Sequence, residues 1–243
     1  RKMFSALEQI SEEGGQVLIT SHSQVFIDQT KRANMFIVRR ENGESRYERK
    51  EENLFDLINE LGARKSDLLL SDFVIYTEGP SDARMLSEIG KRAIVNWDEC
   101  NITTHFLGGL SNVQHCDLEE LKKISGNFGF LLDSDRESQE DSLCDDVQDL
   151  KEECFSNNIP CCVLDRREIE NYFSPEAINE VLELDLSEDS FDEYTNMDEV
   201  LKDKGNYSKT ADGPKIIENM YERGQSINEI EDFLRECIDE ISL

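Results

Sequence analysis

Two apolar stretches of the chain each end in acidic residues. FVIYTEGPSD places Glu78 directly after an apolar run and Asp82 four residues later. NFGFLLDSD ends on Asp133 and Asp135, and neither stretch contains a Lys or Arg. Carboxylates that meet without a neighbouring base repel one another, and a hard divalent cation removes that repulsion. The residue types therefore predict a site for Mg²⁺ or Mn²⁺ with these four acids as ligands.

A simpler interpretation competes with the metal site, because a single Asp at the end of a strand usually caps the next helix. Two strand ends that carry E-G-x-x-D and D-x-D together favour metal binding over capping. Side chains alternate along a strand, so we expect Asp133 and Asp135 to share one side. We expect Asp82 to lie on the first turn of the following helix and to face the same crevice.

Strands and helices must alternate to bring these acids together, and the pattern from residue 72 to 165 does so. Apolar runs predict strands at 73–79, 104–109, 127–135 and 159–165, and helices at 81–90, at 111–125 and up to about residue 155. Such alternation is typical of an α/β fold with a mostly parallel sheet and flanking helices. Ligands of such sheets lie beyond the carboxyl ends of the strands. From about residue 168 onward we expect helices joined by polar loops.

The first part of the chain predicts smaller elements. SALEQISEE is expected to end a helix at Gly14-Gly15, and QVLIT (16–20) to form a strand. Asn42-Gly43 predicts a hairpin between MFIVRR and SRYERK, because this dipeptide favours the tight turn of paired strands. ENLFDLINELG (52–62) has the apolar spacing of a helix.

Composition limits the classes of function. The net charge is −28, with 54 acidic and 26 basic residues, which argues against a broad basic surface for nucleic acid. Residues 31–50 are locally basic, whereas 137–153 and 183–203 are strongly acidic. No apolar run is long enough to span a membrane, and the seven scattered cysteines fit a reducing cytoplasm. The chain begins with Arg1 and has no signal-peptide pattern, so we expect a cytoplasmic piece of a longer protein.

The order of three motifs resembles the Toprim domain, a metal-binding α/β module of topoisomerases, primases and a family of nucleases. EGPSD (78–82) and LLDSD (131–135) match its two acidic motifs, and FLGGLSN (106–112) matches the strand and glycine turn between them. The resemblance covers about residues 70–165. It implies that Glu78 and the Asp133–Asp135 pair engage Mg²⁺ and support phosphodiester chemistry, with Glu78 and Asp133 as catalytic residues.

The segment before these motifs resembles the end of an ABC-type ATPase. In VLITSHSQVFID (17–28) a strand leads to His22, which matches the histidine that senses the γ-phosphate of ATP in such enzymes. The chain contains no GxxxxGK[ST] phosphate-binding loop, so it lacks the other motifs that ATP binding requires. We therefore expect residues 1–66 to be the end of an ATPase domain. Residues 67–243 are expected to form a Toprim nuclease domain with a C-terminal helical extension.

An ATPase end joined to a Toprim domain resembles the OLD (overcoming lysogenisation defect) family, which includes the nuclease subunit of the Gabija antiphage system. REIENYFSPEAI (167–178) is similar to an acidic segment of these nucleases, and it implies Glu170 as a metal ligand, with Glu168 as the alternative. The family also implies a lysine near the scissile phosphate. Lys209 and Lys215 are both candidates.

The combined expectation is a metal-dependent DNA endonuclease or nickase in antiphage defence, regulated by its ATPase portion. Two metal ions would activate water and stabilise the leaving 3′ oxygen, and a lysine would offset the charge on the phosphate. Expected partners are DNA, the ATPase portion, further copies of the chain and a helicase-like defence protein, with no membrane; the basic residues 31–50 are expected to contact the DNA backbone.

Two other functions compete with hydrolysis. A primase or topoisomerase needs a template-binding or tyrosine-bearing domain that the sequence does not show. A degenerate Toprim module, acting as a nucleic-acid or nucleotide sensor or as an oligomer scaffold, is the main alternative. The acidic motifs argue against such a module, and the net charge of −28 argues mildly for it.

Overall fold

The chain divides into two compact units, Arg1–Leu70 and Ser71–Leu243, and each is treated by itself. The computed structural model describes residues 7, 9–20, 34–41, 44–50, 65–107, 118–204 and 207–241. The predicted histidine sensor, His22, and the predicted helix at 52–62 lie outside these residues. The assignment of the first unit to an ATPase therefore stays a prediction.

The first unit contains a confirmed hairpin and one wrong prediction. Strand β1 (Met35–Glu41) pairs antiparallel with β2 (Glu44–Lys50) on either side of Asn42-Gly43, as the turn residues predict. Helix α4 (Lys65–Leu70) closes the unit. Residues 16–20 form no strand, and no described strand pairs with them. An apolar run needs a neighbouring strand to satisfy its backbone groups, and β propensity alone does not supply one.

The second unit is built on a four-stranded parallel sheet, which confirms the α/β class. The strands are β3 (Phe73–Thr77), β4 (Ile102–Phe106), β5 (Phe128–Leu132) and β6 (Cys161–Val163). Their order across the sheet is β4-β3-β5-β6. The chain passes from β3 to β4 in one direction and from β5 to β6 in the other. The direction of winding therefore changes between β3 and β5, and ligands of such sheets bind beside that point.

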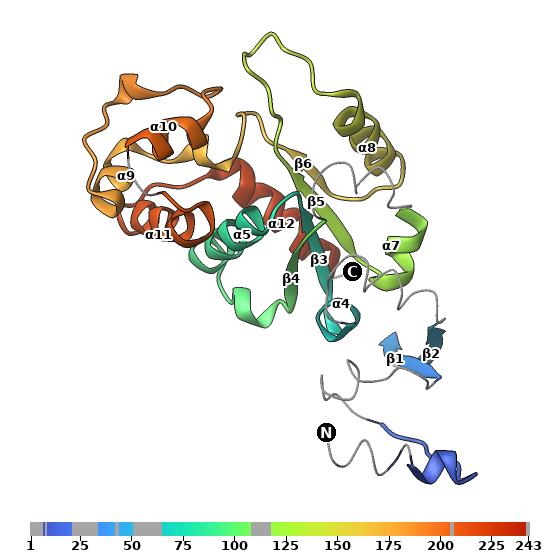
Figure 1. Ribbon diagram of the computed structural model, residues 1–243. Helices are drawn as coiled ribbons and strands as arrows, with labels where there is room; N and C mark the ends of the chain where they lie inside the picture. Colours follow the sequence, from blue (N-terminus) through green and yellow to red (C-terminus); the bar gives the residue numbers. More distant parts are fainter. Residues whose placement is uncertain are drawn as a thin grey trace. The chain divides into compact units, whose positions relative to one another are not determined.

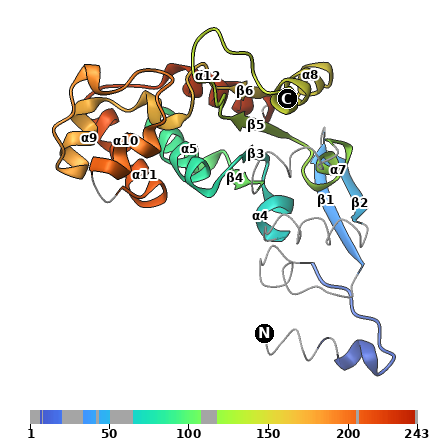
Figure 2. The ribbon, with the colours of Figure 1, turned by 45° about the horizontal axis from the view of Figure 1, so that its top comes forward.

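Helices cover both faces of this sheet (Figure 1). Phe73, Ile75 and Leu131 belong to a core shared with α5 (Pro80–Ala93) and α12 (Asn228–Ile241). The other side of β3 and β5 carries an aromatic group in which Tyr76 contacts Phe128 and Phe130. Helices α7 (Leu118–Ile124) and α8 (Asp145–Ser156) lie on the side away from α5 in both views (Figures 1 and 2). Helix α8 begins later than predicted, since residues 136–144 form a loop.

A group of short helices follows the sheet, as predicted. They are η2 (Ile169–Tyr172), α9 (Pro175–Leu182), η3 (Glu188–Ser190), α10 (Met197–Lys204) and α11 (Lys209–Glu222), while a further turn, η1 (Trp97–Glu99), precedes β4. Buried Ile216, Ile217 and Met220 of α11 join the core beneath α5. This packing fixes the first residue of α11, which is Lys209. None of the helices that the structure describes is long and apolar enough to cross a membrane.

Gly90 lets α5 pack against the indole ring of Trp97. A Cβ at residue 90 would lie 2.6 Å from two ring carbons of Trp97, which is closer than carbon atoms approach without displacement. We expect Gly90→Ala to destabilise the second unit by about 1–3 kcal/mol, because overpacking shifts a buried ring. Thermal unfolding of this variant beside Arg84→Ala, an exposed change on the same helix, measures the effect. Equal unfolding midpoints for the two variants would contradict the expectation.

Candidate functional site

Glu78 and Asp133 meet where the winding of the sheet changes direction. Glu78 directly follows β3 and Asp133 directly follows β5, and these strands are neighbours. The backbone N–H of Asp133 donates a hydrogen bond of 3.1 Å to Oε1 of Glu78. The two strand ends that the sequence selects therefore present their acids side by side.

Asp82 lies on the first turn of α5, as predicted, and it also caps that helix. The backbone N–H of Gly79 donates to Asp82 Oδ2 at 2.8 Å, and the hydroxyl of Ser81 donates to Oδ1 at 3.1 Å. Asp82 is only 8% exposed, and its charge acts on Asp133. The capping interpretation and the clustering of acids thus both hold for this residue.

The D-x-D motif corrects one prediction. Strand β5 ends at Leu132, and Asp135 has a left-handed backbone with φ 52°, so the alternation of a strand does not extend to it. Asp135 is exposed, whereas Ser134 is buried. The Ser134 hydroxyl donates to the carbonyl of Arg166 at 2.9 Å, and the Ser134 and Asp135 N–H groups donate to that of Arg167 at 3.0 and 3.1 Å. These bonds tie the loop after β5 to the loop after β6.

The loop after β6 delivers Glu168 and Glu170. Glu170 lies on η2 and is fully buried. Glu168 is the residue that precedes η2, and it is 8% exposed. Asn171 holds the turn in place: its side-chain oxygen accepts from the N–H of Glu168 at 3.1 Å. Its amide donates to the carbonyls of Asp192 and Thr195 at 3.0 and 2.8 Å. The Asn of the E-x-E-N-Y segment therefore positions the two glutamates.

Replacing Asn171 by Ala is expected to destabilise the protein by about 1–3 kcal/mol, because the change leaves the buried N–H of Glu168 and two partly buried carbonyls without partners. We also expect the affinity for Mn²⁺ to fall, since the loosened turn of Glu168 and Glu170 no longer holds the Lys209 ammonium, which then competes with the ion for Glu78. Chemical denaturation and a Mn²⁺ titration measure the two effects. Asn179→Ala, which removes another side-chain bridge to backbone groups, is the matched control. Unchanged Mn²⁺ affinity in Asn171→Ala would contradict the positioning role.

Lys209 joins these acids, and Lys215 does not. The Lys209 ammonium lies 2.6 Å from Glu168 Oε2, 3.1 Å from Glu170 Oε1 and 3.8 Å from Asp198 Oδ1. Lys215 is largely exposed and pairs with Asp212 on its own helix. The structure thus separates two lysines that the sequence leaves equivalent.

The site has two further members, Tyr207 and Asp198, that no sequence motif indicates. The hydroxyl of Tyr207, which is buried, donates to Glu170 Oε1 at 3.3 Å. Asp198 contacts Lys209 from the start of α10. The sequence offers one signal for Tyr207, which is that an aromatic residue lies two positions before Lys209. Asp198 lies in a strongly acidic run that gave no signal.

Burial dominates the electrostatics of the acids. Burial, and then the charge of Asp135, raises the pKa of Glu78 to about 7, although the N–H of Asp133 opposes the shift. Burial also raises the pKa of Glu170 to about 7, against the influence of Lys209. The pKa of Asp133 lies well above its usual range because of burial and the charges of Asp82 and Glu78. Too little positive charge lies near these carboxyl groups for all of them to ionise together.

Lys209 supplies part of that charge. Burial acts to lower its pKa, but the carboxylates of Glu170 and Glu168 raise it above the usual value, so the ammonium stays charged. Burial raises the pKa of Asp82 in spite of its bonds to Gly79 and Ser81 and the charge of Lys209. Within the described residues, no ion pair reaches Glu78, Asp82, Asp133 or Asp135.

The donor set fits a hard divalent cation. All of the clustered acids offer oxygen, the ligand atom that Mg²⁺ and Mn²⁺ prefer. Glu170 Oε2 is buried and has no hydrogen-bond partner, so it is an acceptor without a donor. Among the residues described, no three acidic, histidine or cysteine side chains are already arranged as a closed metal cage. Binding therefore requires side chains such as Asp82 to turn from their present bonds.

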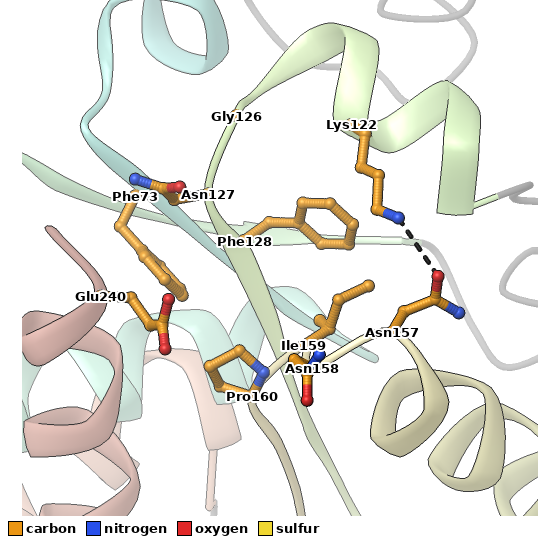
Figure 3. A pocket seen from close by; sticks show the side chains of 10 residues that line it. All are labelled: Phe73, Lys122, Gly126, Asn127, Phe128, Asn157, Asn158, Ile159, Pro160 and Glu240. Carbon is orange, nitrogen blue, oxygen red and sulfur yellow. Dashed lines mark hydrogen bonds between the residues drawn. The ribbon is translucent and has the colours of Figure 1, made fainter. Parts of the chain in front are cut away.

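The opposite edge of the sheet holds a separate cavity of about 130 Å³ (Figure 3). It lies beside Phe73 and Phe128, the first residues of β3 and β5, and beside Pro160, just before β6. Lys122 donates to Asn157 across it at 3.2 Å. The clustered acids lie at the carboxyl ends of the same strands, so this cavity is not part of their site.

Comparison with known proteins leaves the resemblances untested. No protein-family model matches the chain, and no curated protein is found to be similar to it. The arrangement of the acids and Lys209 is therefore the basis for assigning a function.

Proposed function

We propose that the second unit is a metal-dependent phosphodiester hydrolase, and that its substrate is DNA. The observation that carries the proposal is the clustering of acids from three neighbouring strand ends, with the half-buried Lys209 paired to the acids after β6. Glu78, Asp133 and Glu170 follow β3, β5 and β6 in turn, at the edge where parallel sheets bind ligands. The sequence motifs that resemble Toprim and OLD proteins support the choice of DNA.

Each residue has a part in this proposal. Glu78 and Asp133 hold the cation, with Asp82 and Asp135 beside them, and Glu170 is the ligand available to a second ion. A bound divalent cation supplies an activated water molecule and stabilises the negative charge of the leaving oxygen. Lys209, which is charged, offsets charge on the phosphate from the other side. Because Asp135 is exposed while Glu170 is buried, the substrate approaches from the side of the loop after β5.

The cation also answers the objection from net charge. A chain of charge −28 repels DNA, and a divalent cation at the strand ends supplies the local positive potential that the composition lacks. In the first unit, Arg46 and Arg49 of β2 are exposed and suit contact with the DNA backbone. We also propose that the ATPase portion of the protein regulates this hydrolase.

Cleavage of supercoiled plasmid by the full-length protein with Mn²⁺ or Mg²⁺ tests the proposal. We expect nicked or linear product from the wild type and none with chelator, and at least a hundredfold slower cleavage by Glu78→Gln. Glu99→Gln, an exposed change on η1, is the control and should cut normally. Cutting by Glu78→Gln at the wild-type rate would refute the hydrolase. Tight cation binding without cleavage would favour the sensor or scaffold function instead.

A further inference from the structure

The clustered acids fall into two groups that differ in their counter-charge. The first group is Glu78, Asp82, Asp133 and Asp135, to which no ion pair extends among the described residues. The second group is Glu168, Glu170 and Asp198, and the Lys209 ammonium lies within 3.8 Å of all three. One half of the site therefore already contains a cation of the protein's own, and the other half does not.

We propose that the Lys209 ammonium occupies the position of a second divalent cation. The wild-type site then binds one divalent ion, at the first group, and admits a second only when Lys209 leaves the second group. This inference rests on the proposed metal-dependent function and adds to it the number of ions and the residue that controls it.

The contacts of Glu170 support the exclusion of a second divalent ion by Lys209. Its Oε1 forms an ion pair with the Lys209 ammonium at 3.1 Å and accepts a hydrogen bond from Tyr207 at 3.3 Å, so this oxygen is already engaged. Its Oε2 is buried and accepts no hydrogen bond, as is also true of Asp198 Oδ1 in the second group. An ion bound to Oε2 would lie close to the ammonium on Oε1 of the same carboxylate. Like charges at such a distance in a buried site repel strongly, so ion and ammonium exclude each other.

Lys209 is held firmly but is not enclosed. It is the first residue of α11, and its backbone is fixed by the packing of that helix on α5. Its side chain keeps 25% of its surface exposed, whereas that of Glu170 keeps 1%. The ammonium can therefore turn toward solvent, or toward a phosphate at the edge of the sheet, without movement of the backbone. Displacement by an arriving phosphate would free Glu170 for the second ion.

The number of Mn²⁺ ions bound per chain tests the inference in the full-length protein without DNA. Isothermal titration calorimetry with Mn²⁺ is expected to give one tight site per chain for the wild type and two for Lys209→Met, which keeps the length of the side chain and removes its charge. Lys209→Arg, which keeps the charge, should stay at one. Lys91→Met, an exposed lysine of α5, is the matched control and should also give one.

Two tight sites in the wild type, or one in a folded Lys209→Met protein, would overturn the inference. Circular dichroism establishes whether Lys209→Met is folded. If it is not, the wild-type count and the Lys209→Arg count decide, because two ions in either contradicts exclusion. The number of bound ions and the result of plasmid cleavage can differ independently. One bound ion without cleavage would leave this inference standing and remove the nuclease, whereas cleavage with two ions bound to the wild type would do the reverse.

Discussion

Asp133→Asn is expected to abolish metal-dependent cleavage and at the same time to stabilise the metal-free protein. The substitution removes a carboxylate ligand at the centre of the site, which we expect to slow plasmid cleavage by about a thousandfold. It also removes a half-buried carboxyl group whose ionisation the charges of Asp82 and Glu78 oppose. Since Asn has nearly the same shape, we expect a gain of about 1–2 kcal/mol in the free energy of unfolding at pH 7.5 in chelator.

These opposite effects distinguish a functional acid from a structural one, because replacing a carboxylate that serves folding lowers stability. Plasmid cleavage and urea denaturation in chelator are the two measurements. Asp149→Asn, an exposed change on α8, is the control, and both quantities should stay at the wild-type values. Loss of stability in Asp133→Asn would mean that the carboxylate supports the fold and would contradict our account of the site.

The stability of the metal-free protein is expected to fall as the pH rises from 5.5 to 8. Glu170 has an ordinary pKa of 4.5 in the unfolded chain and about 7 in the folded protein. Between these values the folded state binds more protons than the unfolded state, so its stability decreases with rising pH, and the full penalty applies above pH 7. Between pH 5.5 and 8 the penalty for this one group is about 2 kcal/mol, or roughly 4–8 °C in the unfolding midpoint.

Divalent cations should reverse this fall in stability with pH, because they bind only the folded state, through its ionised acids. We expect Mn²⁺ to raise the midpoint strongly at pH 8 and little at pH 5.5, as differential scanning calorimetry can measure. Glu170→Gln should flatten the pH dependence in chelator, while Glu176→Gln, an exposed change on α9, should not. A midpoint that rises with pH in chelator would show that burial does not suppress the ionisation of these acids.

The architecture of the second unit could be predicted because its sequence pattern is local. Short apolar runs bounded by turns gave the strands at 73–77 and 128–132, and their alternation with helices gave a parallel sheet. Errors arose where the outcome depends on distant partners. Residues 16–20 have the composition of a strand but no described neighbour. Asp135 leaves the strand pattern because the loop after β5 bonds to the carbonyl of Arg167, 32 residues later.

The candidate site shows the same division. Glu78 and Asp133 could be paired from sequence, since both end apolar runs of one sheet. The choice between Lys209 and Lys215 could not, because it depends on which side of α11 faces η2. The roles of Tyr207 and Asp198 depend on the packing of helices that carry no chemical motif. Long-range packing of polar residues leaves no periodic signal in a sequence.

The most direct test of the central claim is anomalous diffraction at the manganese absorption edge from crystals of the protein equilibrated with Mn²⁺. We predict an anomalous peak at the carboxyl ends of β3 and β5, at about 2.2 Å from oxygen atoms of Glu78 and Asp133, by analogy with hard-cation sites. A peak at other residues, with none between Glu78 and Asp133, would contradict a metal centre at this edge of the sheet.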